Sequence, residues 1–206
     1  MNKILHDFID GFMFTDIISI DSNRLLKYHN QEEVAEHSLK VASEAVKIAD
    51  RFGLNTEEAE LAGFLHDISK IIHEADMVRI AYELNIDVLE AEKSYPDLLH
   101  TKLSSVMARE IFNIKNSTIL SAIECHSTLK SNPGKLDLVL FIADKISWEI
   151  EDNQHFICEL IQGLDKSLEH GSFAYVNYLY SNKEKLRVIH PWLIDAYYYL
   201  REFCLE

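Results

Sequence analysis

The stretch NQEEVAEHSLKVASEAVKIADRFG, residues 30–53, decides the fold class, because its apolar residues recur at the spacing of an α-helix. Asn30 is a favourable residue at a helix N-cap, and Gly53 is a favourable residue just after a helix end. We therefore expect one amphipathic helix between them. Its buried face is predicted to carry Val34, Val41, Ala45, Ile48 and Phe52.

The same helical periodicity continues over most of the chain. A second helix is predicted to begin at Asn55–Thr56 and to carry Leu61, Leu65 and Ile68, whereas residues 85–96 are expected to form a loop or short turn. The sequence predicts an all-α, single-domain helical bundle. Residues 1–24 are expected to be a helical N-terminal extension packed on a domain of residues 25–206. The further predicted helices cover roughly 74–84, 98–112, 117–128, 135–151, 155–169, 172–181 and 191–203.

Composition limits the classes of function. The chain has 206 residues, with 34 acidic against 20 basic side chains, a formal charge of −14 and 48% apolar residues. This apolar content is enough for a core, while the acidic balance counts against a nucleic-acid-binding protein, which needs a basic face. The three cysteines show no CxxC spacing, so neither a disulfide framework nor a zinc knuckle is indicated. No segment has the pattern of a signal peptide or membrane span, so we expect a cytoplasmic protein without a membrane partner.

Two sites place polar residues where apolar ones are expected. His37 falls on the apolar stripe of the first helix and should point into the core. Taken alone, it is most simply a core histidine hydrogen-bonded to a carbonyl group. His66 and Asp67 lie near the end of the second predicted helix, and Gly63 is expected to leave room beside the imidazole.

Asp144 stands in an apolar run, Leu140-Phe141-Ile142-Ala143-Asp144-Lys145-Ile146-Ser147-Trp148. Burying an unpaired carboxylate is costly, so Asp144 should be paired, protonated or bound to a cation. A pair with Lys145 is not expected, because adjacent helical residues do not face each other. His126 also has apolar residues on its helical face, and His100 opens a predicted helix.

These inward-looking positions are hard to explain as separate core residues, and in one bundle they can converge. Imidazole and carboxylate ligands together suit a divalent transition metal, so a metal site is predicted. A carboxylate-bridged di-iron bundle is a rival, but it requires a Glu-x-x-His motif on two helices. None of the ten histidines has a Glu three residues before it.

The order His37, His66-Asp67, His100, His126 and Asp144 resembles the H…HD…H…H…D pattern of the HD-domain superfamily of metal-dependent phosphohydrolases. Within it, the chain looks like the bacterial symmetrical bis(5'-nucleosyl)-tetraphosphatase branch. The resemblance covers about residues 30–203. It is carried by Glu36-His37-Ser38, Leu65-His66-Asp67-Ile68-Ser69-Lys70, Leu98-Leu99-His100, Ala143-Asp144-Lys145-Ile146 and His190-Pro191-Trp192-Leu193-Ile194-Asp195-Ala196-Tyr197.

The resemblance implies a ligand set and a reaction. A catalytic metal, iron or alternatively manganese or another divalent ion, would be held by His37, His66, Asp67 and Asp144, with His66 and Asp67 central to catalysis. One or two ions are implied, because His100 and His126 would complete a second metal position or face the phosphates. The reaction would be hydrolysis of diadenosine tetraphosphate to two ADP by metal-activated water. Substrate contacts are expected from Lys70, His100, His126, Ser127, Lys145 and His190.

Two departures from the family pattern concern the substrate. Val34 and Ile150 stand where the family usually has arginine, the residue best suited to gripping phosphate in a bidentate manner. Another nucleotide or phosphomonoester therefore remains an alternative substrate. A non-catalytic HD regulatory domain is a further alternative, although such a domain would be expected to lose ligands. The partner is expected to be a small nucleotide, and the sequence leaves a homodimer open.

Overall fold

The computed structural model describes residues 2–148 and 154–204, and within these residues the chain is helical, with no β-strand. The predicted all-α class is therefore confirmed. Among the described residues, three short 3-10 helices accompany the α-helices: η1 (Ile68–Ile71), η2 (Pro96–Leu99) and η4 (Lys183–Lys185). The α-helices are α1 (Lys3–Asp7), α2 (Ile18–Tyr28), α3 (Glu32–Arg51), α4 (Thr56–Leu65), α5 (Glu74–Glu83), α6 (Glu90–Ser94), α7 (His100–Glu110), α8 (Ser117–Cys125), α9 (Lys135–Ser147), α10 (Gln154–Leu164), α11 (Leu168–Ser181) and α12 (Pro191–Cys204).

Helix boundaries differ from the sequence expectations at four places. The expected N-cap Asn30 instead adopts a left-handed conformation with φ of 57°, and α3 begins after Gln31. The helix expected to carry Ile68 ends at Leu65, and Ile68 starts η1. The predicted loop over 85–96 contains α6, whose first turn is closed by a hydrogen bond from the Leu89 backbone N–H to the Glu92 carboxylate, 2.8 Å long. The predicted helix over 135–151 ends at residue 147, and 149–151 lie outside the described residues.

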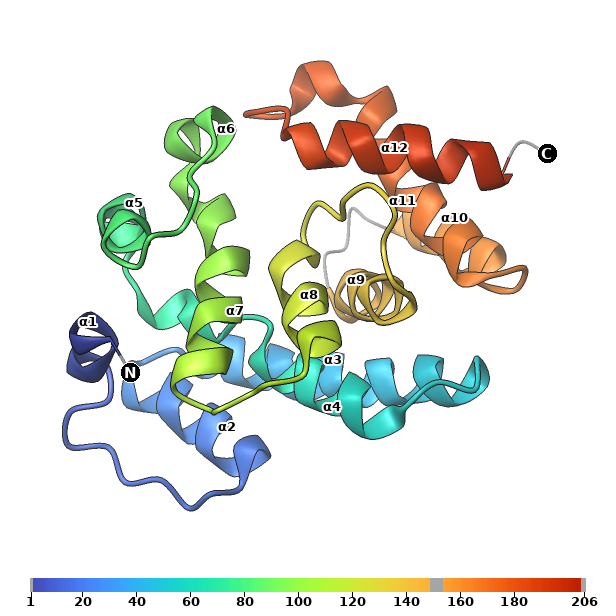
Figure 1. Cartoon of the computed structure of the whole chain (residues 1–206). Coiled ribbons are helices and arrows are strands. Elements are labelled where there is room, and N and C mark those ends of the chain that lie inside the picture. Colours follow the sequence, from blue (N-terminus) through green and yellow to red (C-terminus); the bar gives the residue numbers. More distant parts are fainter. Residues whose placement is uncertain (1, 149–153, 205–206) are drawn as a thin grey trace.

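Two helix pairs form the centre of the bundle (Figure 1). Helices α3 and α4 pack along each other, α9 packs on both of them, and α8 packs on α4 and α9. Helix α7 packs on α8 at one side, and the C-terminal helices α10, α11 and α12 pack in sequence against one another at the opposite side. Helix α11 connects this C-terminal group to α9.

Buried apolar side chains form two clusters rather than one. The first cluster includes Val41 of α3 and Leu65 of α4, and it extends through α8 and α9 to α11 and α12. The second includes Ile68 of η1 and Leu99 of η2, and it extends to α1 and α2 through Leu5 and other residues. Burial of Leu5 packs α1 on the bundle, while the proposed domain division at residue 24 stays a prediction.

The two clusters meet at the polar residues singled out in the sequence. His66 and Asp67 lie between Leu65 of the first cluster and Ile68 of the second. On α3, His37 likewise lies between Ala35 of the second cluster and Val41 of the first. The fold therefore delivers these side chains to the junction of two apolar cores, where few other polar groups compete for them.

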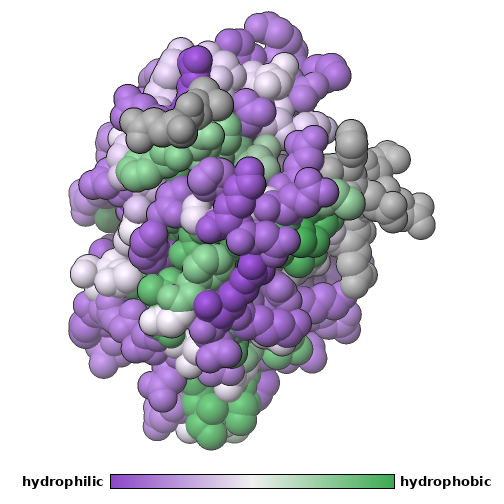
Figure 2. All heavy atoms as spheres, turned by 90° about the vertical axis from the view of Figure 1, so that its right-hand side faces the viewer, coloured by the Kyte–Doolittle hydropathy of each residue, from purple (hydrophilic) through white to green (hydrophobic). Residues whose placement is uncertain are grey.

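The face of the molecule drawn in Figure 2 is mostly hydrophilic. Figure 2 views the side formed by the C-terminal helices and shows apolar side chains in separate patches among hydrophilic ones. Tyr198 and Phe203 are the most exposed large apolar residues of α12. No helix among the described residues has both the length and the apolar character that crossing a membrane requires.

Gly63 marks the closest approach between α3 and α4. A Cβ atom at this position would lie 2.4 Å from the Cα of Ala42, which belongs to the backbone of α3. The glycine was expected to make space for the imidazole of His66. The structure shows that it also makes space for the neighbouring helix, and its carbonyl group receives a hydrogen bond from His66.

Replacing Gly63 with alanine is expected to destabilise the protein by about 3 kcal/mol, because backbone atoms of α3 cannot yield as a side chain would. Denaturant unfolding followed by circular dichroism measures this change. The matched control is Gly134→Ala at the N-cap of α9, where the nearest atom to a new Cβ is 3.7 Å away. The control should lose about 1 kcal/mol or less. Equal losses in the two variants would contradict the close approach.

Candidate metal centre

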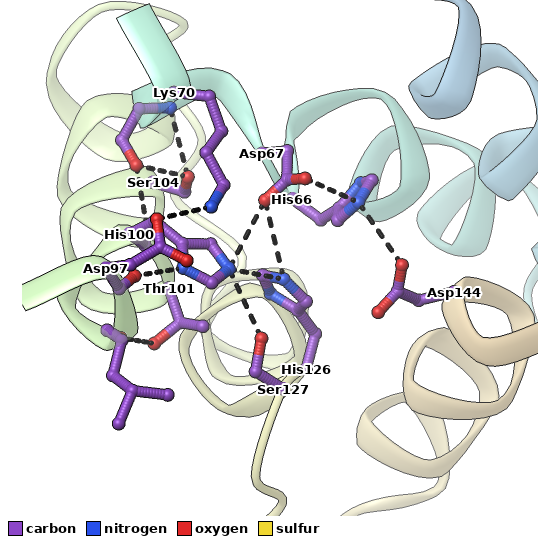
Figure 3. Close-up of polar contacts among 12 residues, drawn as sticks. His66, Asp67, Lys70, Asp97, His100, Thr101, Ser104, His126, Ser127 and Asp144 are labelled. Atoms are coloured by element: carbon purple, nitrogen blue, oxygen red, sulfur yellow. Dashed lines mark hydrogen bonds and ion pairs between the residues drawn. The ribbon is translucent and has the colours of Figure 1, made fainter. Parts of the chain in front are cut away.

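Six side chains from five elements converge at the junction of the two clusters (Figure 3 shows five of them). They come from the middle of α3, from the end of α4, from the first residue of α7, from the end of α8 and from α9. The structure thus brings together all six of the metal ligands predicted from the sequence, which are His37, His66, Asp67, His100, His126 and Asp144.

The first of two possible ligand groups consists of His37, His66 and Asp67, whose candidate ligand atoms all lie within 4.8 Å of one another. Asp144 adjoins this group: its Oδ1 lies 2.9 Å from His37 Nε2 and 3.8 Å from His66 Nε2. The other contact within the group joins His66 Nε2 and Asp67 Oδ2 at 3.5 Å. Asp144 is thus a neighbour of this group, in contact with both of its imidazoles.

The second group consists of Asp67, His100 and His126. The Nε2 atoms of the two histidines are 3.2 Å apart, and Asp67 Oδ1 lies 3.4 Å from the first and 3.6 Å from the second. Asp67 thus belongs to both groups, with one oxygen nearest to each. The sequence predicted that His100 and His126 would join the site, but not that a single carboxylate would link two ligand groups.

A repeated local contact sets the protonation of three of the histidines. Nδ1 of His66 contacts the carbonyl oxygen of Gly63, and Nδ1 of His126 contacts that of Ile123, each at 2.8 Å. His100 makes the same contact to the carbonyl oxygen of Asp97. Because a carbonyl oxygen can only accept, each Nδ1 carries the proton, and each Nε2 presents a lone pair to the centre.

Burial keeps His66 and His100 neutral. It lowers the pKa of His66 to about 4 and that of His100 to about 3, although Asp67 raises both. Burial alone would raise the pKa of Asp67, but His66 first, and then His126 and His100, hold it well below its ordinary value. At neutral pH the centre therefore offers the unprotonated imidazoles of His66 and His100 together with the ionised carboxylate of Asp67, which is the form that binds metals.

Several of the candidate ligand atoms have no hydrogen-bond donor beside them. Among the described residues, the buried atoms His66 Nε2 and Asp67 Oδ1 have no hydrogen-bond partner. Moreover, the Nε2 lone pairs of His100 and His126 face each other and Asp67 Oδ1. The hydroxyl of Ser127 lies 3.2 Å from His100 Nε2, but it can donate only one proton and so can satisfy only one of these acceptors. Converging acceptors of this kind fit a cation, and mixed imidazole and carboxylate ligands fit a divalent transition metal ion.

Asp144 has a partner that the sequence analysis excluded. Lys145 Nζ lies 2.6 Å from Asp144 Oδ2, although the two residues are adjacent. The long side chain of Lys145 folds back and is almost fully buried, with its ammonium group facing the rings of Phe141, Trp148 and Tyr175 at 5.4–5.6 Å. Burial would raise the pKa of Asp144, but Lys145 first, and then His37, hold it well below its ordinary value.

The remaining predicted substrate contacts lie around the centre. Lys70 Nζ forms an ion pair with Asp97 at 2.7 Å (Figure 3). Asp97 was not predicted from the sequence. It stands three residues before His100 and contacts this histidine through its backbone carbonyl, in the same way as Gly63, three residues before His66, contacts His66. His190 is buried with its Nε2 3.4 Å from Glu92 Oε1, and it lines a cavity together with Ser127.

A cavity of about 450 Å³ opens onto the first ligand group. His37 and Asp67 lie in its wall, and Trp148 is 43% exposed beside them. Val34, one of the two departures from the family pattern, also lines this cavity. Ile150, the other departure, lies outside the described residues. A molecule in this cavity can therefore reach the predicted ligands directly.

Comparisons with known proteins agree with this geometry. The family model described as "HD domain" matches residues 34–149. An "Uncharacterized protein in pepC 5'region" of Lactococcus lactis subsp. cremoris is 40% identical over 69% of this chain and 72% of that protein. A "Bis(5'-nucleosyl)-tetraphosphatase, symmetrical" of Staphylococcus aureus is 34% identical over 61% of this chain and 64% of that protein.

A solved structure covers nearly the whole chain. It is described as a "predicted HD superfamily hydrolase involved in NAD metabolism" from Clostridium acetobutylicum. It superimposes with a TM-score of 0.78 at 26% identity, covering 93% of this chain and 98% of its own.

We expect the purified protein to contain a transition metal, and Asp67→Ala to remove most of it, because this residue belongs to both ligand groups. Elemental analysis of the purified variants measures the loss. The matched control is Asp97→Ala, whose carboxylate pairs with Lys70 and belongs to neither ligand group. The control should keep its metal. Stoichiometric metal in the double variant His66→Ala, Asp67→Ala would contradict the assignment.

Proposed function

Because the chain is a phosphohydrolase that belongs to the HD domain family, we propose that it cleaves diadenosine tetraphosphate, or a close relative, symmetrically into two ADP. Family membership confirms the resemblance predicted from the sequence. The proposal for the substrate is supported by curated relatives named symmetrical bis(5'-nucleosyl)-tetraphosphatase. The single observation that carries the chemistry is Asp67, a carboxylate shared by two groups of ligand atoms, with its Oδ1 buried.

The centre suits phosphoryl chemistry with a resident metal. His37, His66, Asp67 and Asp144 would hold one ion, and Asp67, His100 and His126 would hold a second. Iron is the metal we propose, with manganese or another divalent ion as the alternative. When bound, such an ion lowers the pKa of water towards neutrality and polarises a phosphoryl oxygen.

The side chains of the centre have separate tasks in the proposed reaction. Asp67 stays ionised, so it can accept a proton from the attacking water molecule. The water oxygen bonds to one of the two central phosphorus atoms, the bond from that atom to the bridging oxygen breaks, and one ADP leaves with the bridging oxygen. Ser127, whose hydroxyl lies beside His100, can donate a hydrogen bond to a phosphate oxygen.

The acidic net charge does not prevent binding of this anionic substrate. Lys40 lines the cavity at His37, and Lys70 lies beside His100, paired with Asp97. Together with a bound cation, these ammonium groups set a positive local potential on a chain whose net charge is negative. Small nucleotides are therefore compatible with a charge of −14, whereas a long polyanion would meet the acidic surface.

Incubating the metal-loaded protein with diadenosine tetraphosphate and resolving the products by chromatography tests the proposal. ADP alone is the expected product, because the cut falls between the second and third phosphates. Asp67→Asn should lower the rate by about a hundredfold or more, since it removes a ligand and the proton acceptor.

The other outcomes each lead to a different conclusion. AMP with ATP would reject the symmetrical cut. Turnover of another nucleotide or phosphomonoester without turnover of diadenosine tetraphosphate would assign a different HD phosphohydrolase activity. No turnover of any tested nucleotide by the metal-loaded protein would favour a regulatory HD domain.

A further inference from the structure

A second cavity, of about 350 Å³, is separate from the cavity at His37. The two cavities share no lining residue. Ser127 lines the second cavity, and its hydroxyl oxygen is 3.2 Å from Nε2 of His100. One cavity thus opens onto the first ligand group, and the other adjoins the second.

The walls of the second cavity are chemically different from those of the first. Glu33, Glu36 and Asp67 line the first cavity, whereas the second has no acidic residue among its lining residues. Its walls are mainly apolar, with leucine and valine side chains and the ring of Tyr95, and its charged residues are Lys185 and Arg187. Such a pocket suits a flat, uncharged group that is attached to an anionic one.

Arg187 is free to bind an anion. Its side chain is exposed, and its guanidinium carbon lies 5.2 Å from the centre of the Tyr95 ring. Among the residues that the structure describes, it has no hydrogen-bond acceptor and no carboxylate partner. In a chain with 34 acidic residues, an arginine without an acidic partner at the edge of a cavity is informative, because bidentate binding of phosphate remains available to it.

The wall of this cavity is held in place by buried polar contacts. Lys102 Nζ pairs with Glu92 at 2.9 Å, and Glu92 Oε1 lies 3.4 Å from His190 Nε2. The same ammonium group lies 5.1 Å from the centre of the Trp192 ring. These contacts join α6 and α7 to the first residues of α12. The cavity is therefore preformed, which lowers the entropic cost of binding.

Most of the wall comes from outside the part of the chain that matches the HD domain. That match ends at residue 149, whereas the lining residues from Leu179 to Leu193 belong to α11, to α12 and to the segment between them. The metal ligands lie inside the matched part. Recognition through this cavity is thus a property of the C-terminal helices of this chain, separate from the chemistry of the centre.

We propose that the second cavity binds one nucleoside of the substrate, with Arg187 and Lys185 contacting the adjoining phosphates. This inference rests on the proposed function, because a dinucleoside polyphosphate has a nucleoside at each end and its phosphates must cross the centre. The other nucleoside then lies in the cavity at His37, beside the exposed ring of Trp148. The two ends of a symmetrical substrate are consequently held by dissimilar pockets.

Titration of the metal-loaded protein with adenosine and with ADP, followed by NMR or calorimetry, tests the proposal. Val188→Trp places a large ring in the cavity and is expected to weaken adenosine binding by about tenfold or more. The matched control is Ile189→Trp, because the neighbouring Ile189 is 41% exposed and does not line the cavity. The control should bind adenosine as the unmodified chain does.

Arg187→Ala, at an exposed position that does not threaten folding, is expected to weaken ADP binding about fivefold while changing adenosine binding little. Unchanged adenosine binding in folded Val188→Trp, or unchanged ADP binding in Arg187→Ala, would overturn the pocket assignment.

The pocket and the proposed function can fail separately. If diadenosine tetraphosphate is cleaved to ADP but Val188→Trp alters neither adenosine binding nor the KM for this substrate, the pocket is wrong and the function stands. If adenosine binding depends on Val188 in a chain that does not cleave diadenosine tetraphosphate, the pocket stands and the proposed function is wrong.

Discussion

The structure depends on the compensation of buried negative charge. Asp144 is 4% exposed and lies among apolar side chains, where an unpaired carboxylate would destabilise the fold by several kcal/mol. Contacts with His37 and Lys145 compensate this charge, whereas Asp67 Oδ1 has no hydrogen-bond partner among the described residues and is placed for compensation by a cation. The imidazoles of His66 and His126 are in turn oriented by carbonyl groups of α4 and α8. The positions of α3, α4, α7, α8 and α9 are thus linked through two carboxylates.

The location of the centre between two apolar clusters explains how these groups can be buried without disturbing a core. A single continuous core would have to enclose six polar side chains among apolar ones. Here the polar residues lie where one cluster ends and the other begins, as His66 and Asp67 do between Leu65 and Ile68. Each cluster keeps an apolar interior, and the ligand atoms are reached from the cavity at His37 rather than through either cluster.

Periodicity was sufficient to predict the helical class and most of the long helices, because their apolar stripes are regular. It failed for α6, a five-residue helix whose formation depends on the contact of Glu92 with the Leu89 backbone and on Lys102, ten residues further on. The six converging side chains could be predicted because polar residues on apolar faces are conspicuous.

The pair of Asp144 with Lys145 could not be predicted from helical spacing alone. Adjacent Cβ atoms diverge, but four methylene groups let the lysine ammonium return to its neighbour when three aromatic rings surround it. Similarly, the position of Asp67 between two ligand groups depends on how α4, α7 and α8 are placed relative to one another. Spacing along a single helix carries no information on that placement.

The ligand set also has a consequence for the lifetime of the protein. His37 and Asp144 are 107 residues apart, and the ligands come from segments attached to both clusters. An ion held there acts as a cross-link that stabilises only the folded chain, in the way that any ligand specific to the native state does. Scarcity of the metal in a cell would then increase the unfolded fraction open to proteases, so that metal supply governs the abundance of the protein as well as its catalysis.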